Sequence, residues 1–158
     1  MARFTRTSPA PIVKGDYPAY RPFVRKDFEQ CCAYCYLHER HAAGEFNFQL
    51  DHYRPKHLFP NLRKQFENLY WSCSVCNGIR SKYKHWPSDE LLAKGICFVD
   101  LCKDDFDQHY EILPDGRLKA LTPSADYTID KINLNSDHLV KLRAILRREG
   151  TRLDAEPT

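Results

Sequence analysis

Two closely spaced pairs of cysteines carry the clearest chemistry in this sequence. Cys32 pairs with Cys35 and Cys73 with Cys76, and each pair encloses two residues. Two thiolates at this spacing can chelate one tetrahedral metal ion, so the two pairs together can form a four-cysteine zinc site. A thioredoxin-like redox pair would need a βαβ context that is missing here, and buried free thiols would not explain two matched pairs. We therefore predict one structural zinc ion.

The other three cysteines are weaker candidates for metal ligands. Cys31 could replace Cys32 through a C-x-x-x-C spacing, but this is the poorer match. Cys97 and Cys102 lie in or beside a short apolar run, 96–99, and we expect them to be core thiols. The total of seven is odd, and the spacing is not that of a secreted disulfide framework.

The long segment between the cysteine pairs leads to four polar residues that could build a second site. Alternating apolar and polar residues predict a strand over 46–52 that ends at Asp51 and His52. Asn68 and Asn77 follow further along the chain. Neighbours on an ideal strand point to opposite faces, so Asp51 and His52 can serve a metal ion and a water only if the strand end is twisted or bulged. The alternative is an ordinary strand end followed by two turn-forming asparagines.

The motifs of residues 32–82 follow one another in a characteristic order. They read C-A-Y-C, then L-D-H-Y-R-P-K, then F-E-N-L-Y-W-S-C-S-V-C-N-G-I-R-S-K. This pattern resembles the HNH endonuclease family, in the branch that carries a four-cysteine zinc site. The shared features include the Asp-His pair, the Asn-Leu before the second cysteine pair and the asparagine directly after it. The last position of the family motif is often His and is Asn77 here, which shifts the ligand preference toward oxygen.

The resemblance implies a small α+β nuclease with a ββα-metal core on the zinc scaffold, which hydrolyses phosphodiester bonds in DNA. It makes His52 the general base and Asn68 the residue that holds the His52 loop and ring in place. Asp51 and Asn77 become ligands of one catalytic magnesium or manganese ion, a role that suits carboxylate and amide oxygens. A neutral imidazole can also accept a proton from water near neutral pH.

Basic residues lie on both sides of the motif and could contact the phosphates of DNA. They would add affinity without reading bases. These residues are Arg54, Lys56, Arg80, Lys82 and Lys84. Residues 1–88 hold 14 Lys/Arg against 7 Asp/Glu, while the rest holds 10 against 14, so the two parts carry +7 and −4. A basic first half fits an anionic partner, although a solvated surface with scattered charge would give the same count.

The chain reads as one domain with an irregular segment at each end. Four of the ten prolines precede residue 25, which opposes a helix and predicts an extended arm over residues 1–24. The nuclease domain would cover 25–150, with its core at 32–84 and a C-terminal extension at 88–150. Residues 151–158 would form a frayed tail.

The expected helices are short except in the extension. A turn sequence at 114–116 predicts a hairpin over residues 109–121. Two helices should follow at 124–134 and 136–149. The second has leucines on one face, and we expect its basic residues, Arg143 among them, to lie on a solvated face. Short helices are also expected at 25–30, at 61–68 and from Cys76 onward.

The composition is that of a globular protein. Charged residues make up 28% and aromatic residues 13%, which excludes collagen-like, low-complexity and wholly disordered chains. The longest apolar stretch, Cys31 to Leu37, is far shorter than the roughly 20 residues of a membrane helix. Since no secretory signal is recognisable either, we expect a cytoplasmic protein without a membrane partner.

More loosely, the whole chain resembles the HNH proteins of bacterial defence systems of the Septu and retron type. The segment T-I-D-K-I-N-L-N followed by a basic helix with L-V-K-L-R carries this resemblance. The family setting implies an ATPase partner. Two alternatives to an autonomous nuclease stay open, namely a zinc-stabilised nucleic-acid-binding or adaptor module without catalysis, and a nuclease subunit that is active only with a partner.

Overall fold

The computed structural model describes residues 1–78 and 82–154 of the chain, which has 158 residues. The fold is α+β, as predicted, with two small antiparallel sheets and short helices around them. The helices are α1 (Arg21–Asp27), α2 (Ser74–Gly78), α3 (Asp89–Ala93), α4 (Phe106–His109), α5 (Pro123–Ile132) and α6 (Asp137–Arg148). The strands are β1 (Phe48–His52), β2 (Leu69–Cys73), β3 (Tyr110–Ile112) and β4 (Leu118–Ala120). Among the described residues, no helix is long and apolar enough to cross a membrane.

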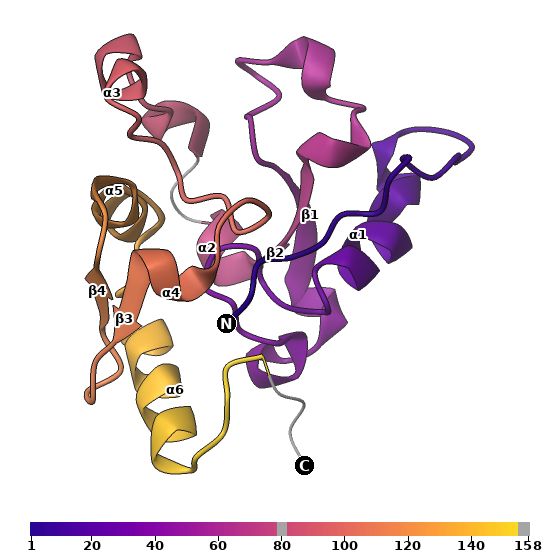
Figure 1. The fold of residues 1–158 in the computed structure, drawn as a ribbon. Coiled ribbons are helices and arrows are strands. Elements are labelled where there is room, and N and C mark those ends of the chain that lie inside the picture. Colours follow the sequence, from indigo (N-terminus) through magenta and orange to yellow (C-terminus); the bar gives the residue numbers. More distant parts are fainter. Residues whose placement is uncertain (79–81, 155–158) are drawn as a thin grey trace.

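The first sheet and the helix that follows it position the candidate site. β1 pairs with β2 in an unbroken antiparallel register, from Phe48 opposite Cys73 to His52 opposite Leu69. Every residue of β2 is buried, and the strand runs directly into α2. Figure 1 shows α2 at the centre of the molecule, between this sheet and the C-terminal elements. β1 begins at Phe48 rather than at residue 46, because Glu45–Asn47 form a 3-10 turn.

The connection between β1 and β2 contains no continuous helix. The helix predicted over 61–68 is replaced by two 3-10 turns, Pro60–Leu62 and Phe66–Asn68. Pro60 stands at the start of the first turn, where its missing N–H removes no hydrogen bond. The connection is therefore a loop. Its backbone carbonyls can accept hydrogen bonds from side chains of the sheet, as the Arg63 carbonyl does from His52.

The N-terminal arm is shorter than predicted. Residues Tyr17–Tyr20 form a 3-10 turn, and α1 starts at Arg21 instead of residue 25. The prolines of this region occupy the first positions of both elements, where a helix tolerates them. The arm also packs on the domain, because Phe4 is buried against Phe28 and Tyr36 at ring distances of 4.9 and 4.7 Å.

The C-terminal extension forms the predicted hairpin and two helices. Gly116, in the turn between β3 and β4, has a φ of +89°, and a Cβ there would lie 2.2 Å from the carbonyl oxygen of Val140 in α6. Only glycine allows the turn to approach the helix so closely. Part of the predicted tail is docked, since Leu153 is buried and its carbonyl accepts a hydrogen bond from the His38 N–H at 2.9 Å.

Candidate active site and metal centre

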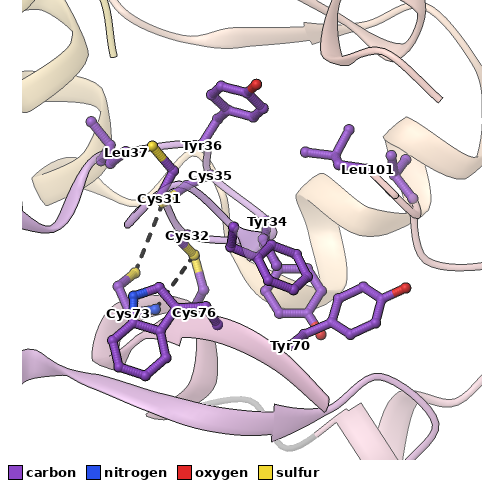
Figure 2. Packing of buried hydrophobic residues seen from close by; sticks show 14 of the residues in the cluster. Cys31, Cys32, Tyr34, Cys35, Tyr36, Leu37, Tyr70, Cys73, Cys76 and Leu101 are labelled. Atoms are coloured by element: carbon purple, nitrogen blue, oxygen red, sulfur yellow. Dashed lines mark hydrogen bonds between the residues drawn. The ribbon is translucent and has the colours of Figure 1, made fainter. Parts of the chain in front are cut away.

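The two cysteine pairs converge on one point in the core, as predicted. The four sulfur atoms of Cys32, Cys35, Cys73 and Cys76 lie within 4.8 Å of one another, and all four residues are buried. Figure 2 shows the two knuckles facing each other, with dashed lines for the hydrogen bonds between them. The Cys35 and Cys73 sulfurs are 3.9 Å apart, and the Cys73 N–H donates to the Cys32 sulfur at 3.4 Å. This arrangement could hold one structural zinc ion.

The electrostatics of the cluster fit a metal bound by thiolates. Burial raises the pKa of the Cys32 thiol, but hydrogen bonds from Cys35, Cys73 and Cys76 outweigh this and hold that pKa well below its usual value. Four sulfur ligands gathered in this way form a site that a divalent cation can enter by displacing protons. The donor set, four sulfurs in a closed and buried arrangement, is that of structural zinc rather than catalytic zinc.

The remaining cysteines do not join the cluster. The Cys31 thiol donates instead to the Glu29 carbonyl at 3.4 Å, and burial raises its pKa well above the ordinary value. The cluster found among the described residues also leaves out Cys97 and Cys102, which are only partly buried and not the core thiols that were expected. The C-x-x-C pairing through Cys32 is therefore the one that the fold assembles.

A pocket of about 310 Å³ lies at the end of β1 and collects most of the predicted catalytic residues. His52, the last residue of β1, is buried with its Nε2 2.9 Å from the carbonyl oxygen of Arg63. Since a carbonyl can only accept, Nε2 carries the proton and Nδ1 keeps its lone pair in the neutral ring. The ring of Tyr17 meets the imidazole edge-on at 4.8 Å. Burial lowers the pKa of His52, against an opposing effect of the Arg63 carbonyl.

Asp51 lines the same pocket, although it is the neighbour of His52 on a strand without a bulge. His52 is the last residue of the strand, and its side chain lines this pocket together with Asp51. One carboxylate oxygen of Asp51, Oδ2, accepts a hydrogen bond from the Tyr34 hydroxyl and lies 2.6 Å from the ammonium of Lys82. The other oxygen, Oδ1, has no hydrogen-bond partner among the described residues.

Lys82 does not have the exposed position that a contact to DNA phosphates requires. Its ammonium is buried and donates to the carbonyl oxygens of His52 and Tyr53 at 2.7 and 3.1 Å, in addition to the Asp51 contact. These three acceptors use all three N–H donors of a lysine. Burial lowers the pKa of Lys82, and the nearby Asp51 opposes this. The side chain thus binds the end of β1 rather than the surface of a ligand.

The side chain of Asn68 holds the loop that carries the carbonyl partner of His52. Its Oδ1 accepts from the Arg54 N–H at 2.8 Å, and its Nδ2 donates to the carbonyls of Arg54 and Leu62 at 3.0 and 3.3 Å. One buried amide therefore ties the residues after β1 to the residue before Arg63. These contacts hold the backbone next to Arg63, whose carbonyl is the partner of His52.

Asn77, in α2, also lines the pocket. Its Nδ2 donates to Gln49 Oε1 at 3.2 Å, which leaves the amide oxygen of Asn77 for another ligand. Gln49 and Asp51 lie two positions apart on β1 and so share a face of the strand. The pocket is therefore lined by one carboxylate oxygen and one amide oxygen without assigned partners in the described part of the chain.

The other predicted phosphate contacts have different positions. Arg54 and Lys84 are exposed, and the Lys84 ammonium lies 5.9 Å from the ring centroid of Tyr83. Lys56 is half-buried and lines the pocket, with its ammonium 5.8 Å from the ring centroid of Tyr17. Arg80 lies outside the described residues. Three of the five predicted cations thus remain at or near the surface.

Several residues of the site were missed by the sequence analysis. Gln49 had a usable signal, because it precedes Asp51 by two positions on the same strand. Tyr34 lies inside the first C-x-x-C knuckle, and Tyr17 lies in the proline-rich segment, and neither position indicates a contact with the site. Arg63 contributes its backbone carbonyl, so its side-chain type carries no signal at all.

Comparisons with known proteins give one distant similarity. No family model matches the chain. The chain is similar to the Septu protein PtuA of Bacillus mycoides (strain KBAB4), with 23% identity over an alignment 155 residues long. The match covers 83% of this chain and 21% of that protein. The chain thus spans about a fifth of the length of this curated relative.

Proposed function

We propose that this protein is a metal-dependent endonuclease of the HNH type that hydrolyses phosphodiester bonds in DNA. One observation carries the proposal, namely the pairing of His52 Nε2 with the Arg63 carbonyl, which leaves Nδ1 as a base in a pocket lined by Asp51 and Asn77. The order β1, β2, α2 around this pocket is the order of a ββα-metal core.

His52 acts as the proton acceptor in the proposed reaction. Nδ1 takes a proton from a water molecule while the water oxygen attacks the phosphorus atom. The bond from phosphorus to the 3′ oxygen breaks, and this oxygen leaves with the electron pair and takes a proton from solvent water to become a hydroxyl. The Arg63 carbonyl fixes the ring and its tautomer, and it also stabilises the imidazolium that forms. Asn68 acts one step further away, because it holds the loop on which this carbonyl lies.

Two oxygen atoms of the pocket would hold the catalytic metal ion. Asp51 Oδ1 and the amide oxygen of Asn77 would hold a magnesium or manganese ion, whose usual protein ligands are one or two such oxygens with water and phosphate as the others. When bound, this ion would stabilise the negative charge that grows on the phosphate. Lys82 keeps the carboxylate of Asp51 in one orientation through its 2.6 Å contact.

The proposed substrate contacts are electrostatic. Arg54, Lys56 and Lys84 surround the pocket or lie near it in the chain, and they would contact phosphates on either side of the scissile bond. Arg80 belongs to the same proposal on the basis of the sequence alone. Such contacts would make binding depend strongly on salt and weakly on sequence.

The similarity to a Septu protein supports a place in a bacterial defence system. A nuclease subunit that cuts only with a partner, for which the sequence resemblance suggests an ATPase, is the second candidate. The ion pair of Asp51 with Lys82 favours it, because a lysine that neutralises the pocket carboxylate weakens the attraction for a divalent cation. A partner could then supply part of what the isolated chain lacks.

The proposal is tested with plasmid and single-stranded DNA in the presence of magnesium, manganese or EDTA. His52→Ala should lower the rate of cleavage about a hundredfold or more while zinc content and DNA affinity stay near those of the wild type. His57→Ala is the matched control, since His57 also lines the pocket but is exposed. Cleavage by His52→Ala at the wild-type rate would overturn the mechanism. If the wild-type protein bound DNA but did not cleave it, either alone or together with a partner protein, the adaptor module would be favoured.

A further inference from the structure

A groove of about 400 Å³ adjoins the His52 pocket. Its lining comes from the loop after β1 and from the chain around α3, which lie at the same end of the molecule in Figure 1. The loop lines both spaces, because Tyr53 and Arg54 belong to the groove while Pro55 and Lys56 belong to the pocket. A strand of DNA bound in the pocket could therefore continue into the groove.

Trp86 gives the groove an aromatic surface. The Phe59 ring meets the indole edge-on at 5.3 Å, and the Phe98 ring packs against it at 6.1 Å. These rings hold Trp86 in place, yet the residue stays partly exposed, in contrast to the fully buried Trp71. An aromatic side chain that is fixed and accessible is a surface on which a nucleic-acid base can stack.

The charged side chains that line the groove among the described residues are both cationic. The Arg54 guanidinium is exposed. Lys103 is 72% exposed, and its ion pair with Asp100 at 3.4 Å is of a kind that contributes little energy. Carboxylates line the pocket on the other side of these two cations, through Glu67 and Asp100. The groove is thus the side that would attract phosphate.

We propose that the groove binds an unpaired nucleotide of the DNA substrate, with its base stacked on Trp86 and its phosphates near Arg54 and Lys103. The inference rests on the proposed function, since the His52 pocket would hold the scissile phosphate. A base inside a duplex has both faces covered by its stacked neighbours, so only a single-stranded nucleotide can offer a face to the indole. An apolar side chain of a protein would gain nothing from the two cations. The preferred substrate would therefore be single-stranded next to the cleavage site.

The main test measures the binding of a labelled oligothymidylate, which forms no base pairs, by fluorescence anisotropy without added divalent metal. Trp86→Ala should weaken binding about 5- to 150-fold, the range expected for the loss of one stacked base. Phe46→Ala is the matched control, because it truncates an exposed aromatic residue outside the groove, and it should bind like the wild type. Unchanged binding by Trp86→Ala would overturn the proposal.

Tryptophan fluorescence locates the bound strand independently of affinity. The chain has two tryptophans, and Trp71 is fully buried, so quenching by the oligothymidylate would come from Trp86. In Trp86→Phe the quenching should disappear while most of the affinity remains, because a phenyl ring also stacks on bases and preserves the packing on Phe98. Quenching that persisted in Trp86→Phe, or that was absent from the wild type, would contradict binding in the groove.

A charge reversal at the surface decides the question if Trp86→Ala does not fold. Lys103→Glu should weaken oligothymidylate binding severalfold at low salt, and the difference from the wild type should shrink as the salt concentration rises. Lys94→Glu is the matched control, since Lys94 is also an exposed lysine with a carboxylate partner but does not line the groove. Equal effects of the two reversals would show attraction by net charge alone and would contradict the proposal.

Cleavage assays distinguish failure of this inference from failure of the proposed function. With manganese, the wild type should cut a duplex that carries a single-stranded flap faster than the same duplex without one, and Trp86→Phe should keep this preference while Trp86→Ala loses it. Quenching by single strands without cleavage of any DNA would support the groove and refute the nuclease. Cleavage that depends on His52, without quenching or a preference for the flap, would support the nuclease and refute the groove.

Discussion

The cysteine cluster and the His52 pocket meet at the junction of β2 and α2, where Cys76 and Asn77 are neighbours, yet they are built differently. The cluster is closed, with four identical ligands that lie within 4.8 Å of one another. The pocket is open, and its groups are held by contacts from distant segments, such as Lys82 on Asp51 and the Arg63 carbonyl on His52. The ligands of the first site can therefore be recognised from the spacing within each cysteine pair, whereas the groups of the second site are set by contacts between different segments. Mutations should separate the two.

The largest effect is expected in the cluster. Cys73→Ser should abolish zinc binding and with it the compact fold, because the free energy of zinc binding would be folding free energy. Elemental analysis and the dispersion of an NMR spectrum measure both losses. Cys97→Ser is the control and should keep the full zinc content. A protein purified without chelator and free of zinc, but still folded, would contradict the prediction.

A smaller effect, confined to the pocket, distinguishes its two proposed metal ligands. Asp51→Ala leaves the Lys82 ammonium buried without its counter-charge, which should lower the free energy of unfolding by about 3–5 kcal/mol. Asn77→Ala removes one hydrogen bond to Gln49 and should lower it by about 1 kcal/mol or less. Denaturant titrations with zinc present give both values.

Cleavage assays on the same two variants test the metal role itself. In Asn77→Ala, high manganese should restore part of the lost activity, because excess metal compensates for a weaker site by mass action. It should not restore activity in His52→Ala, since added metal does not replace a proton acceptor. Equal responses of the two variants to manganese would argue against separate roles for Asn77 and His52.

Asn68→Ala tests how far the pocket depends on its loop. The change removes three hydrogen bonds and leaves the partly buried backbone groups of Arg54 without this partner, so stability should fall by about 1–3 kcal/mol. Cleavage should fall by roughly tenfold as the Arg63 carbonyl loses its place beside His52, a smaller effect than loss of the base itself. Asn61→Ala, at an exposed position of the same loop, is the control. Unchanged cleavage in Asn68→Ala would show that the loop keeps its position without this amide.

The contrast between the cysteine cluster and the His52 pocket also explains which features of the protein the sequence could predict. The cysteine pairs, the strand into Asp51 and His52, and the C-terminal hairpin and helices follow from spacing, alternation and turn residues, all of which are local. Lys82 and Arg143 were expected at the surface because isolated charges usually are. Both are buried because the fold surrounds them with acceptors from remote segments, namely carbonyl oxygens for both and the Asp51 carboxylate for Lys82. A single sequence carries no signal for such partners.

The smallest predicted effect concerns the surface around the pocket, where the position of Lys82 changes the choice of residues. Arg54 and Lys84 are exposed and not bound to carboxylates among the described residues, so they are the better candidates for phosphate contacts. Replacing both with Ala should weaken DNA binding to a similar extent for all sequences, and the slope of log K against log salt should become shallower by about 0.9 for each phosphate that is no longer neutralised.

Fluorescence anisotropy at several salt concentrations measures this slope. Lys94→Ala, which removes an exposed lysine already paired with Glu90 at 2.8 Å, is the control. If the double variant kept the wild-type slope while His52→Ala still abolished cleavage, the pocket would stand as a catalytic site whose DNA is held by other residues.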